Sequence, residues 1–297
     1  MTKLFTGSIV ALVTPMTSRG RIDSDAYTRL LRFHLGRGTD GIVVGGTTGE
    51  SATLTPDELS QLLVSAREQL GERVPLIAGT GSASTQHAIE LSRLACEAGA
   101  DACLVVTPYY NKPTQVGLER HYRAIADAID KPVLLYNVPG RTGCDLAVDT
   151  VIRLAGHPRI TGIKEATGDI ARAPAILNAT ENFTVLSGDD FSALRLMQAG
   201  AHGVVSVTAN VTPARMSALC KAARDDDLAA ASQIDAQLQP LHRALFVAPN
   251  PIPVKYALHR MGLVADGIRL PLTWLEPDAQ QDVETALTAL GVETATA

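Results

Sequence analysis

The sequence contains few aromatic residues and carries no excess of basic ones. Aromatic side chains make up 4% of the 297 residues, with one Trp and five Phe, and the formal net charge is −5. Proteins that bind nucleic acid usually gather lysine and arginine on one surface, and those that bind single strands also offer rings on which bases stack. We therefore do not expect nucleic acid to be a partner of this protein.

Cysteine is scarce, and its spacing does not suggest a metal site. The four residues, Cys96, Cys103, Cys144 and Cys220, form no C-x-x-C pair, and the seven histidines include no H-E-x-x-H motif. Both patterns are typical of metal-binding proteins. We expect buried free thiols and no metal ion.

Long apolar runs are also missing. No stretch reaches the roughly 20 residues that a membrane-spanning helix needs, so we expect no membrane partner. The apolar run at 8–13 is short, is followed by Thr14 and Pro15, and has no small-residue cleavage site of the kind that ends a signal peptide. We interpret this run as the first strand and expect a cytoplasmic protein.

Short apolar segments recur through the first two-thirds of the chain, with amphipathic segments between most of them. They run almost without polar interruption, as expected for parallel strands that are buried on both faces. Eight such repeats predict a (β/α)8 TIM barrel. A doubly wound open sheet is the alternative, but Gly79-Thr80-Gly81 is followed by Ser84 where a dinucleotide fingerprint has its third glycine. The expected strands are 8–13, 41–44, 75–78, 102–106, 132–136, 160–164, 183–186 and 203–207.

After Val211 the pattern becomes helical. Helices are expected at 212–224, 227–246, 254–261 and 277–290, and no strand candidate remains in this part of the sequence. We therefore predict a barrel catalytic domain at 1–224 and a C-terminal helical extension at 225–297.

Lys164 is the most informative residue. It stands at the end of the apolar run 160–164, where a buried ammonium group would lose its hydration at a cost of several kcal/mol. A lysine that has given up its proton is a nucleophile that can form a Schiff base with a carbonyl substrate. The structural alternative is that Lys164 reaches solvent from the strand end or pairs with Glu165.

Polar residues follow other expected strands, and the active sites of TIM barrels lie at the carboxyl ends of their strands. The second strand is followed by a glycine-rich, hydroxyl-rich segment with Thr47 and Thr48, which suits a small carboxylate. Tyr110, Tyr136 and Arg141 follow the fourth and fifth strands. Asp189 and Asp190 follow the seventh and would repel a phosphate ester. The combination favours a Schiff-base aldolase or lyase that acts on a small keto acid.

With these motifs, the chain resembles the dihydrodipicolinate synthase family of the pyruvate-dependent class I aldolase superfamily. The resemblance covers nearly the whole chain. It is carried by Gly-Thr-Thr-Gly-Glu-Ser at 46–51, Tyr-Tyr-Asn at 109–111, Tyr-Asn-Val-Pro-Gly-Arg-Thr-Gly at 136–143 and Gly-Ile-Lys-Glu-Ala at 162–166.

The resemblance implies an activity and a set of residue roles. Pyruvate would condense with L-aspartate 4-semialdehyde to give 4-hydroxy-tetrahydrodipicolinate, in the diaminopimelate route to lysine. No cofactor would be needed, because the iminium formed on the lysine is itself the electron sink. Lys164 would form the Schiff base, and Thr48, Tyr136 and Tyr110 would form a hydroxyl relay. The pyruvate pocket would include Thr47, Thr48, Gly188 and Val205, and Arg141 would receive the carboxylate of the semialdehyde.

The resemblance also bears on assembly and regulation. It implies that Tyr110 reaches the site of a neighbouring subunit, and that the protein is a homotetramer built as a dimer of dimers. Many members are inhibited by lysine through an acidic residue and polar or aromatic groups at the dimer interface. The corresponding positions here are Pro56, Leu59, Ala83 and His87, so we expect weak or absent inhibition by lysine.

Two other functions share parts of this pattern. An N-acetylneuraminate lyase or a keto-deoxy sugar acid aldolase of the same superfamily would share the barrel and the lysine, but Arg141 and the double threonine at 47–48 favour the synthase. A non-catalytic barrel that senses keto acids would have no need of a proton relay.

Overall fold

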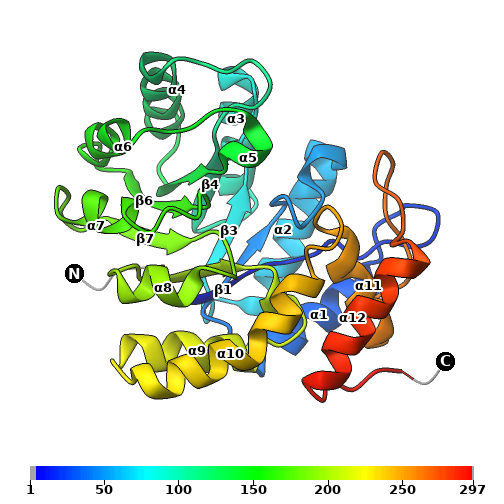
Figure 1. The fold of residues 1–297 in the computed structure, drawn as a ribbon. Helices are drawn as coiled ribbons and strands as arrows, with labels where there is room; N and C mark the ends of the chain where they lie inside the picture. Colours follow the sequence, from blue (N-terminus) through cyan, green and yellow to red (C-terminus); the bar gives the residue numbers. More distant parts are fainter. Residues whose placement is uncertain (1–4, 296–297) are drawn as a thin grey trace.

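The computed structural model describes residues 5–295, and within that range eight parallel strands close into a barrel (Figure 1). The strands are arranged in chain order, and β1 pairs with β8 to close the circle. The TIM-barrel prediction is confirmed, and the open doubly wound sheet is wrong. The strands are β1 Gly7–Ala11, β2 Gly41–Val44, β3 Leu76–Gly79, β4 Ala102–Val106, β5 Val133–Asn137, β6 Ile160–Glu165, β7 Thr184–Ser187 and β8 Gly203–Ser206.

The predicted strand ends differ from the observed ones by no more than a residue or two. β2 and β4 have the predicted bounds, whereas β5, β6 and β7 each continue one residue further. For β6 this extra residue is Glu165. Lys164 therefore lies within the paired part of β6, opposite Tyr136 of β5 and Leu186 of β7. Pairing on both sides fixes the backbone from which the Lys164 side chain projects.

Apolar side chains of the described residues form separate clusters on the two faces of the sheet. Successive side chains of a strand point to opposite faces, so Val43 of β2 packs inside the barrel while its neighbours Ile42 and Val44 pack against the outer helices. The inner cluster includes Tyr136 and Val205. Because both faces are buried, these strands have the near-continuous apolar sequences from which the parallel sheet was predicted.

Helices surround the barrel, and several begin at a capping residue that the sequence supplies. At the start of α2, the Thr55 hydroxyl accepts from the backbone N–H of Glu58, and the Glu58 carboxylate accepts from that of Thr55. A threonine followed three residues later by a glutamate has the spacing that this reciprocal capping needs. The elements outside the strands up to residue 224 are α1 Ser24–Leu35, η1 Ser51–Thr53, α2 Pro56–Leu70, α3 Thr85–Glu97, α4 Gln115–Asp127, α5 Pro139–Thr142, α6 Val148–Ala155, α7 Arg172–Leu177, α8 Ala193–Gln198, η2 Thr208–Asn210 and α9 Pro213–Arg224.

The helices after the barrel lie along one side of it (Figure 1). Helix α9 packs against β1, and α10 Leu228–Ala244 packs against α9. Helix α12 Pro277–Ala289 packs against both α10 and α11 Ile252–Arg260. The predicted start of α11, at 254, was too late, because the first helical turn tolerates Pro253. The domain division after residue 224 stays a prediction, and residues 1–4 and 296–297 lie outside the described range.

Two of the composition-based predictions can be compared with the described residues. All four cysteines are free thiols, but Cys96 is only partly buried, so the prediction that every thiol is buried was wrong. Cys96 is near the C-terminal end of α3, where the helix surface meets solvent. No helix within residues 5–295 has the length and apolar character needed to cross a membrane.

Candidate active site

The carboxyl ends of the strands surround a small cavity of about 40 Å3, and the predicted nucleophile lines it. Lys164 of β6, Tyr136 of β5 and the segment after β2 that carries Thr47 and Thr48 contribute polar groups to the same space. The remaining wall residues are Ala11, Val43, Gly45, Gly46, Ser51, Gly79, Gly81, Leu104 and Val106. The tertiary structure therefore brings together four of the predicted site residues from three strand ends.

Lys164 is held with little exposure to solvent. Its side chain is buried, with 7% of the residue surface accessible, and its Nζ lies 4.2 Å from the ring centroid of Tyr136. Glu165 points to the other side of β6, where its Oε2 accepts from Arg172 Nε at 2.9 Å. No ion pair within residues 5–295 involves Lys164, so the alternative in which Lys164 pairs with Glu165 is wrong.

Gly188, at the end of β7, packs directly against the stem of Lys164. A Cβ at this position would lie 2.9 Å from Cε and 3.0 Å from Cγ of Lys164, and 2.6 Å from the Cβ of Ala166. Real Cβ atoms essentially never come within 3.0 Å of another heavy atom, so the contacts with Ala166 Cβ and Lys164 Cε would be too close, and that with Lys164 Cγ would be at the limit. Glycine at 188 thus leaves room for the extended lysine side chain.

Gly188 and Val205 are not among the residues that line the cavity. Val205 belongs to the apolar cluster inside the barrel, with 1% of its surface accessible, and Gly188 contacts the lysine stem instead. That both residues belong to the pyruvate pocket stays a prediction. Of the two, Gly188 packs against the side chain of Lys164.

Thr48 is bonded to a residue that the sequence did not single out. Its Oγ1 accepts a hydrogen bond of 2.9 Å from Nδ2 of Asn250, in the segment that leads into α11. Both residues are buried. The sequence showed this segment only as a proline-rich turn. Its contact with the site could not be predicted, because 202 positions separate the two residues.

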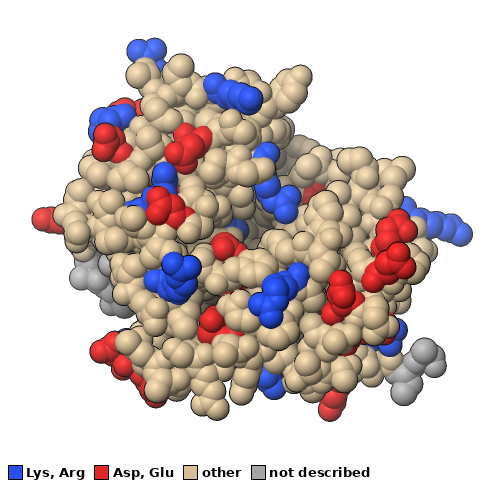
Figure 2. Space-filling view, viewed as in Figure 1, with Lys and Arg blue, Asp and Glu red and all other residues tan. Residues whose placement is uncertain are grey.

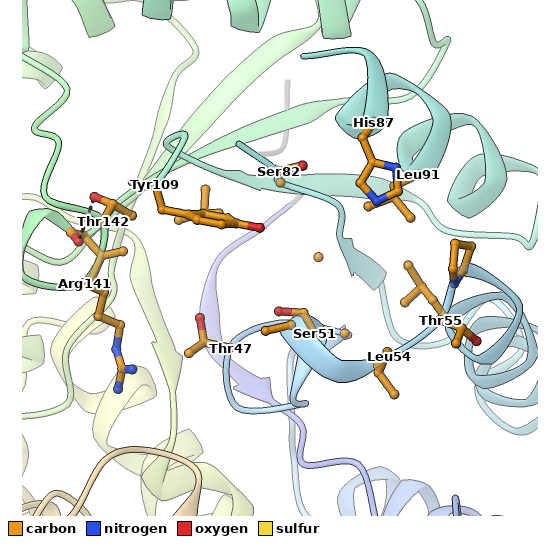
Figure 3. Close-up of a pocket in the computed structure, with 18 residues that line it drawn as sticks. Thr47, Ser51, Leu54, Thr55, Ser82, His87, Leu91, Tyr109, Arg141 and Thr142 are labelled. Carbon is orange, nitrogen blue, oxygen red and sulfur yellow. Dashed lines mark hydrogen bonds between the residues drawn. The ribbon is translucent and has the colours of Figure 1, made fainter. Parts of the chain in front are cut away.

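A larger pocket of about 370 Å3 adjoins the cavity and opens to the surface (Figure 3). The two spaces share wall residues, among them Thr47, Ser51 and Val106, so they are continuous. Arg141 and Tyr109 lie on one side of the outer pocket, and His87 lies across from them. Pro56 and Leu59 also line it, whereas Ala83 does not. A substrate longer than pyruvate can therefore extend from the cavity towards Arg141.

Arg141 is the principal cation of the outer pocket. It lies in the short helix α5 and is exposed, and within residues 5–295 its guanidinium makes no ion pair or side-chain hydrogen bond. Figure 2 shows acidic and basic side chains interspersed over this face of the molecule, without a continuous basic patch. An unpaired arginine beside a pocket without acidic wall residues can bind a carboxylate in a bidentate manner.

Tyr110 lies outside both spaces. It is 92% exposed, and its backbone has a φ of 73°, in the left-handed region that non-glycine residues rarely adopt. Lys112, two residues later, also has a positive φ, of 45°. Within a single chain, the exposed Tyr110 ring therefore contributes to neither space.

The two aspartates after β7 are used locally. Oδ2 of Asp190 accepts from the backbone N–H groups of Val207 and Thr208 at 2.9 and 3.0 Å, and Asp189 accepts from the Ser192 hydroxyl at 2.8 Å. They therefore fix the turns after β7 and β8. Across the described residues, no group of three His, Cys, Asp or Glu side chains is placed to hold a metal ion.

Comparison with known proteins agrees with this geometry. The family model described as "Dihydrodipicolinate synthetase family" matches residues 4–290. The curated 4-hydroxy-tetrahydrodipicolinate synthase of Pseudomonas aeruginosa is 53% identical over 290 residues, which cover 97% of this chain and 99% of the relative.

Solved structures of the same family superpose closely. The dihydrodipicolinate synthase of Acinetobacter baumannii, solved with pyruvate, has a TM-score of 0.95 and 49% identity, covering 97% of this chain and 99% of that one. The enzyme of Cyanidioschyzon merolae, solved with lysine bound, has a TM-score of 0.95 and 39% identity, covering 98% and 100%. With a family model over nearly its whole length and these relatives, the chain belongs to the dihydrodipicolinate synthetase family.

Proposed function

We propose that this enzyme condenses pyruvate with L-aspartate 4-semialdehyde to give 4-hydroxy-tetrahydrodipicolinate, in the diaminopimelate route to lysine. The activity is that of the curated relatives, which are 53% identical over 97% of the chain. The observation that carries the residue assignment is the buried Lys164, which projects into a small cavity beside the Tyr136 ring. The larger pocket beyond it gives room for the second substrate.

Lys164 supplies the covalent step. Its unprotonated amine attacks the keto carbon of pyruvate, and the resulting carbinolamine loses water to give an iminium. Loss of a proton from the methyl group then gives an enamine. The iminium accepts the electron pair of the broken C–H bond, so the chemistry needs no cofactor. The enamine carbon attacks the aldehyde of the second substrate. The amino group of that substrate displaces Lys164, closes the ring and regenerates the free lysine.

Thr47 and Thr48 bind the pyruvate carboxylate in this proposal, with glycine-rich backbone around them. In this proposal the backbone around Gly188 and Val205 belongs to the pyruvate site, and Gly188 also packs against the stem of Lys164. The hydroxyls of Thr48 and Tyr136 move protons as the carbinolamine forms and breaks. Tyr110 of the partner subunit completes this relay, which would explain why Tyr110 is 92% exposed in its own chain. The functional unit is then at least a dimer, and we propose a homotetramer in the cytoplasm.

The test of the proposed activity is a coupled assay. Product formed from pyruvate and aspartate 4-semialdehyde is followed through NADPH loss with added dihydrodipicolinate reductase. A rate that requires both substrates supports the synthase. Release of pyruvate from N-acetylneuraminate or from a keto-deoxy sugar acid, with no synthase rate, would favour the lyase alternatives. A sensor would give neither rate and no pyruvate-dependent trapping by borohydride.

Replacing Arg141 with leucine is expected to weaken the binding of the second substrate, aspartate 4-semialdehyde, and not that of pyruvate. Charge-assisted hydrogen bonds contribute about 1.5–3 kcal/mol, so kcat/KM for aspartate 4-semialdehyde should fall about 10- to 100-fold. The KM for pyruvate should change little, because Arg141 lines the outer pocket and not the inner cavity. Steady-state kinetics with each substrate varied in turn measures both effects.

Arg159→Leu is the matched control for Arg141→Leu. Arg159 precedes β6 at the opposite end of the barrel, where it pairs with the exposed Asp130. It should leave both kinetic constants near the wild-type values. An Arg141→Leu enzyme with an unchanged KM for the semialdehyde would remove Arg141 from the proposed substrate site.

Millimolar L-lysine is expected to leave the synthase rate nearly unchanged. The outer pocket has no acidic wall residue, and neither Arg141 nor His87 supplies the negative charge that would pair with an ammonium group. The measurement is the coupled rate over a lysine titration, with His87→Glu as the companion variant. Inhibition of the wild type at physiological lysine concentrations would refute the prediction, and gained sensitivity in His87→Glu would support its physical basis.

A further inference from the structure

A fully buried ion pair joins the active-site loop to helix α11. Lys255 Nζ donates to Oε1 of Glu50, and 205 positions separate the two residues in the chain. Their side chains are 0% and 1% exposed. Burial lowers the pKa of Lys255, and the charge of Glu50 opposes that shift. Neither residue lines the catalytic cavity.

Glu50 stands in a strained position two residues after Thr48. Its φ of 59° lies in the left-handed region, which is unfavourable for a residue with a side chain. Its second carboxylate oxygen accepts from the backbone N–H of Arg269 at 3.1 Å. The surrounding loop is also tight, because the Thr14 hydroxyl donates to the carbonyl of Gly49 at 2.7 Å. The contacts of the Glu50 side chain thus hold a backbone turn that would not otherwise be favoured.

The same end of α11 carries the contact to Thr48. Asn250 immediately precedes Pro251, and the backbone N–H of Lys255 donates to the carbonyl of Pro251 at 3.0 Å. One rigid turn therefore presents both Asn250 and Lys255 to the loop after β2. A hydroxyl has one proton and two lone pairs. Because Asn250 donates to the Thr48 oxygen, the Thr48 proton remains available to donate to another group.

Stability alone does not account for a buried pair of this kind. Replacing both members of a buried ion pair with neutral residues of similar size is often neutral or stabilising, whereas removing one member is strongly destabilising. A buried pair can instead serve by fixing the geometry of the segments that it joins. Here that geometry is the turn that carries Thr48.

We propose that Lys255, Glu50 and Asn250 are positioning residues, which together hold the Thr48 hydroxyl in its catalytic orientation. This inference rests on the role of Thr48 in the proposed function. The C-terminal segment then has a part in catalysis. From outside the barrel, the start of α11 fixes Thr48, which lines the catalytic cavity.

The experiment compares the double variant Glu50→Gln/Lys255→Met with each single variant. The single variants leave a buried group unpaired and should lower Tm, while the double variant should recover most of that loss. If the pair positions Thr48, kcat of the double variant stays about tenfold or more below wild type despite its recovered Tm. The KM for aspartate 4-semialdehyde, which depends on Arg141, should not change. A double variant with wild-type Tm and kcat within about twofold of wild type would overturn the proposal.

A second measurement decides the matter even if the double variant does not fold. Asn250→Ala removes no charge, and it should lower kcat in the wild-type background but have almost no further effect in a Thr48→Val background. Such non-additivity is expected when one residue acts through the other. Additive losses, or no loss in Asn250→Ala, would contradict a positioning role. The wild-type synthase rate and its pyruvate adduct test the proposed function separately.

Discussion

A Lys164→Met enzyme should lose essentially all synthase activity and should no longer form a covalent adduct with pyruvate. Lys164 is the amine that lines the catalytic cavity, and the cavity holds it against the Tyr136 ring at 4.2 Å. Without the imine there is no electron sink for the carbanion, so we expect kcat to fall by about 1,000-fold or more. Methionine fills a similar volume, which keeps the packing against Gly188. The measurements are the coupled rate and the mass of the protein after borohydride treatment with pyruvate.

Lys131→Met is the control for this loss. Lys131 is exposed and precedes β5, at the end of the barrel opposite the cavity. This variant should keep both the rate and the single pyruvate adduct. Adduct formation in Lys164→Met, or its absence in the wild type, would show that another group carries the chemistry.

A Tyr136→Phe enzyme should still form the pyruvate adduct but should turn over about 100- to 1,000-fold more slowly. Phenylalanine keeps the ring beside which Lys164 Nζ lies, so the nucleophile stays in place. Only the hydroxyl that passes protons is lost, and a positioned acid or base commonly contributes 10²- to 10⁴-fold. The split between adduct formation and kcat therefore separates the proton relay from the covalent step.

Tyr122→Phe is matched to this change because Tyr122 is a second buried tyrosine of the same barrel. Its hydroxyl donates to the carbonyl of Val105 at 3.2 Å, outside the catalytic cavity. Loss of that hydrogen bond should lower stability by about 1 kcal/mol and leave kcat unchanged. Equal kcat values in Tyr136→Phe and wild type would remove Tyr136 from the relay.

The sequence by itself determined the barrel and the residue types at its strand ends. Parallel strands buried on both faces need near-continuous apolar segments, and that requirement is local enough to be read along the chain. Lys164 could be predicted for the same reason, since an ionisable residue inside such a segment is conspicuous. The motifs around it then indicated the family.

The sequence also placed some boundaries and contacts wrongly. It set the start of α11 two residues too late and ended β6 before Glu165. It left open whether Glu165 pairs with Lys164. In the structure, the Glu165 carboxylate forms an ion pair with Arg172. Strand alternation puts Lys164 and Glu165 on opposite faces, a consequence that becomes firm only when the strand is known to include both.

Only the tertiary structure decided how the C-terminal helices meet the site. The contacts of Asn250 with Thr48 and of Lys255 with Glu50 join parts of the chain that are more than 200 positions apart, as their separations of 202 and 205 show. Periodicity and capping are local patterns, so they cannot predict contacts between residues that are so far apart in the sequence. The left-handed backbone of Tyr110, with a φ of 73°, could likewise not be predicted, because tyrosine has no preference for that region. Local sequence patterns thus specified which elements form, and packing between distant segments specified how the reactive groups are held.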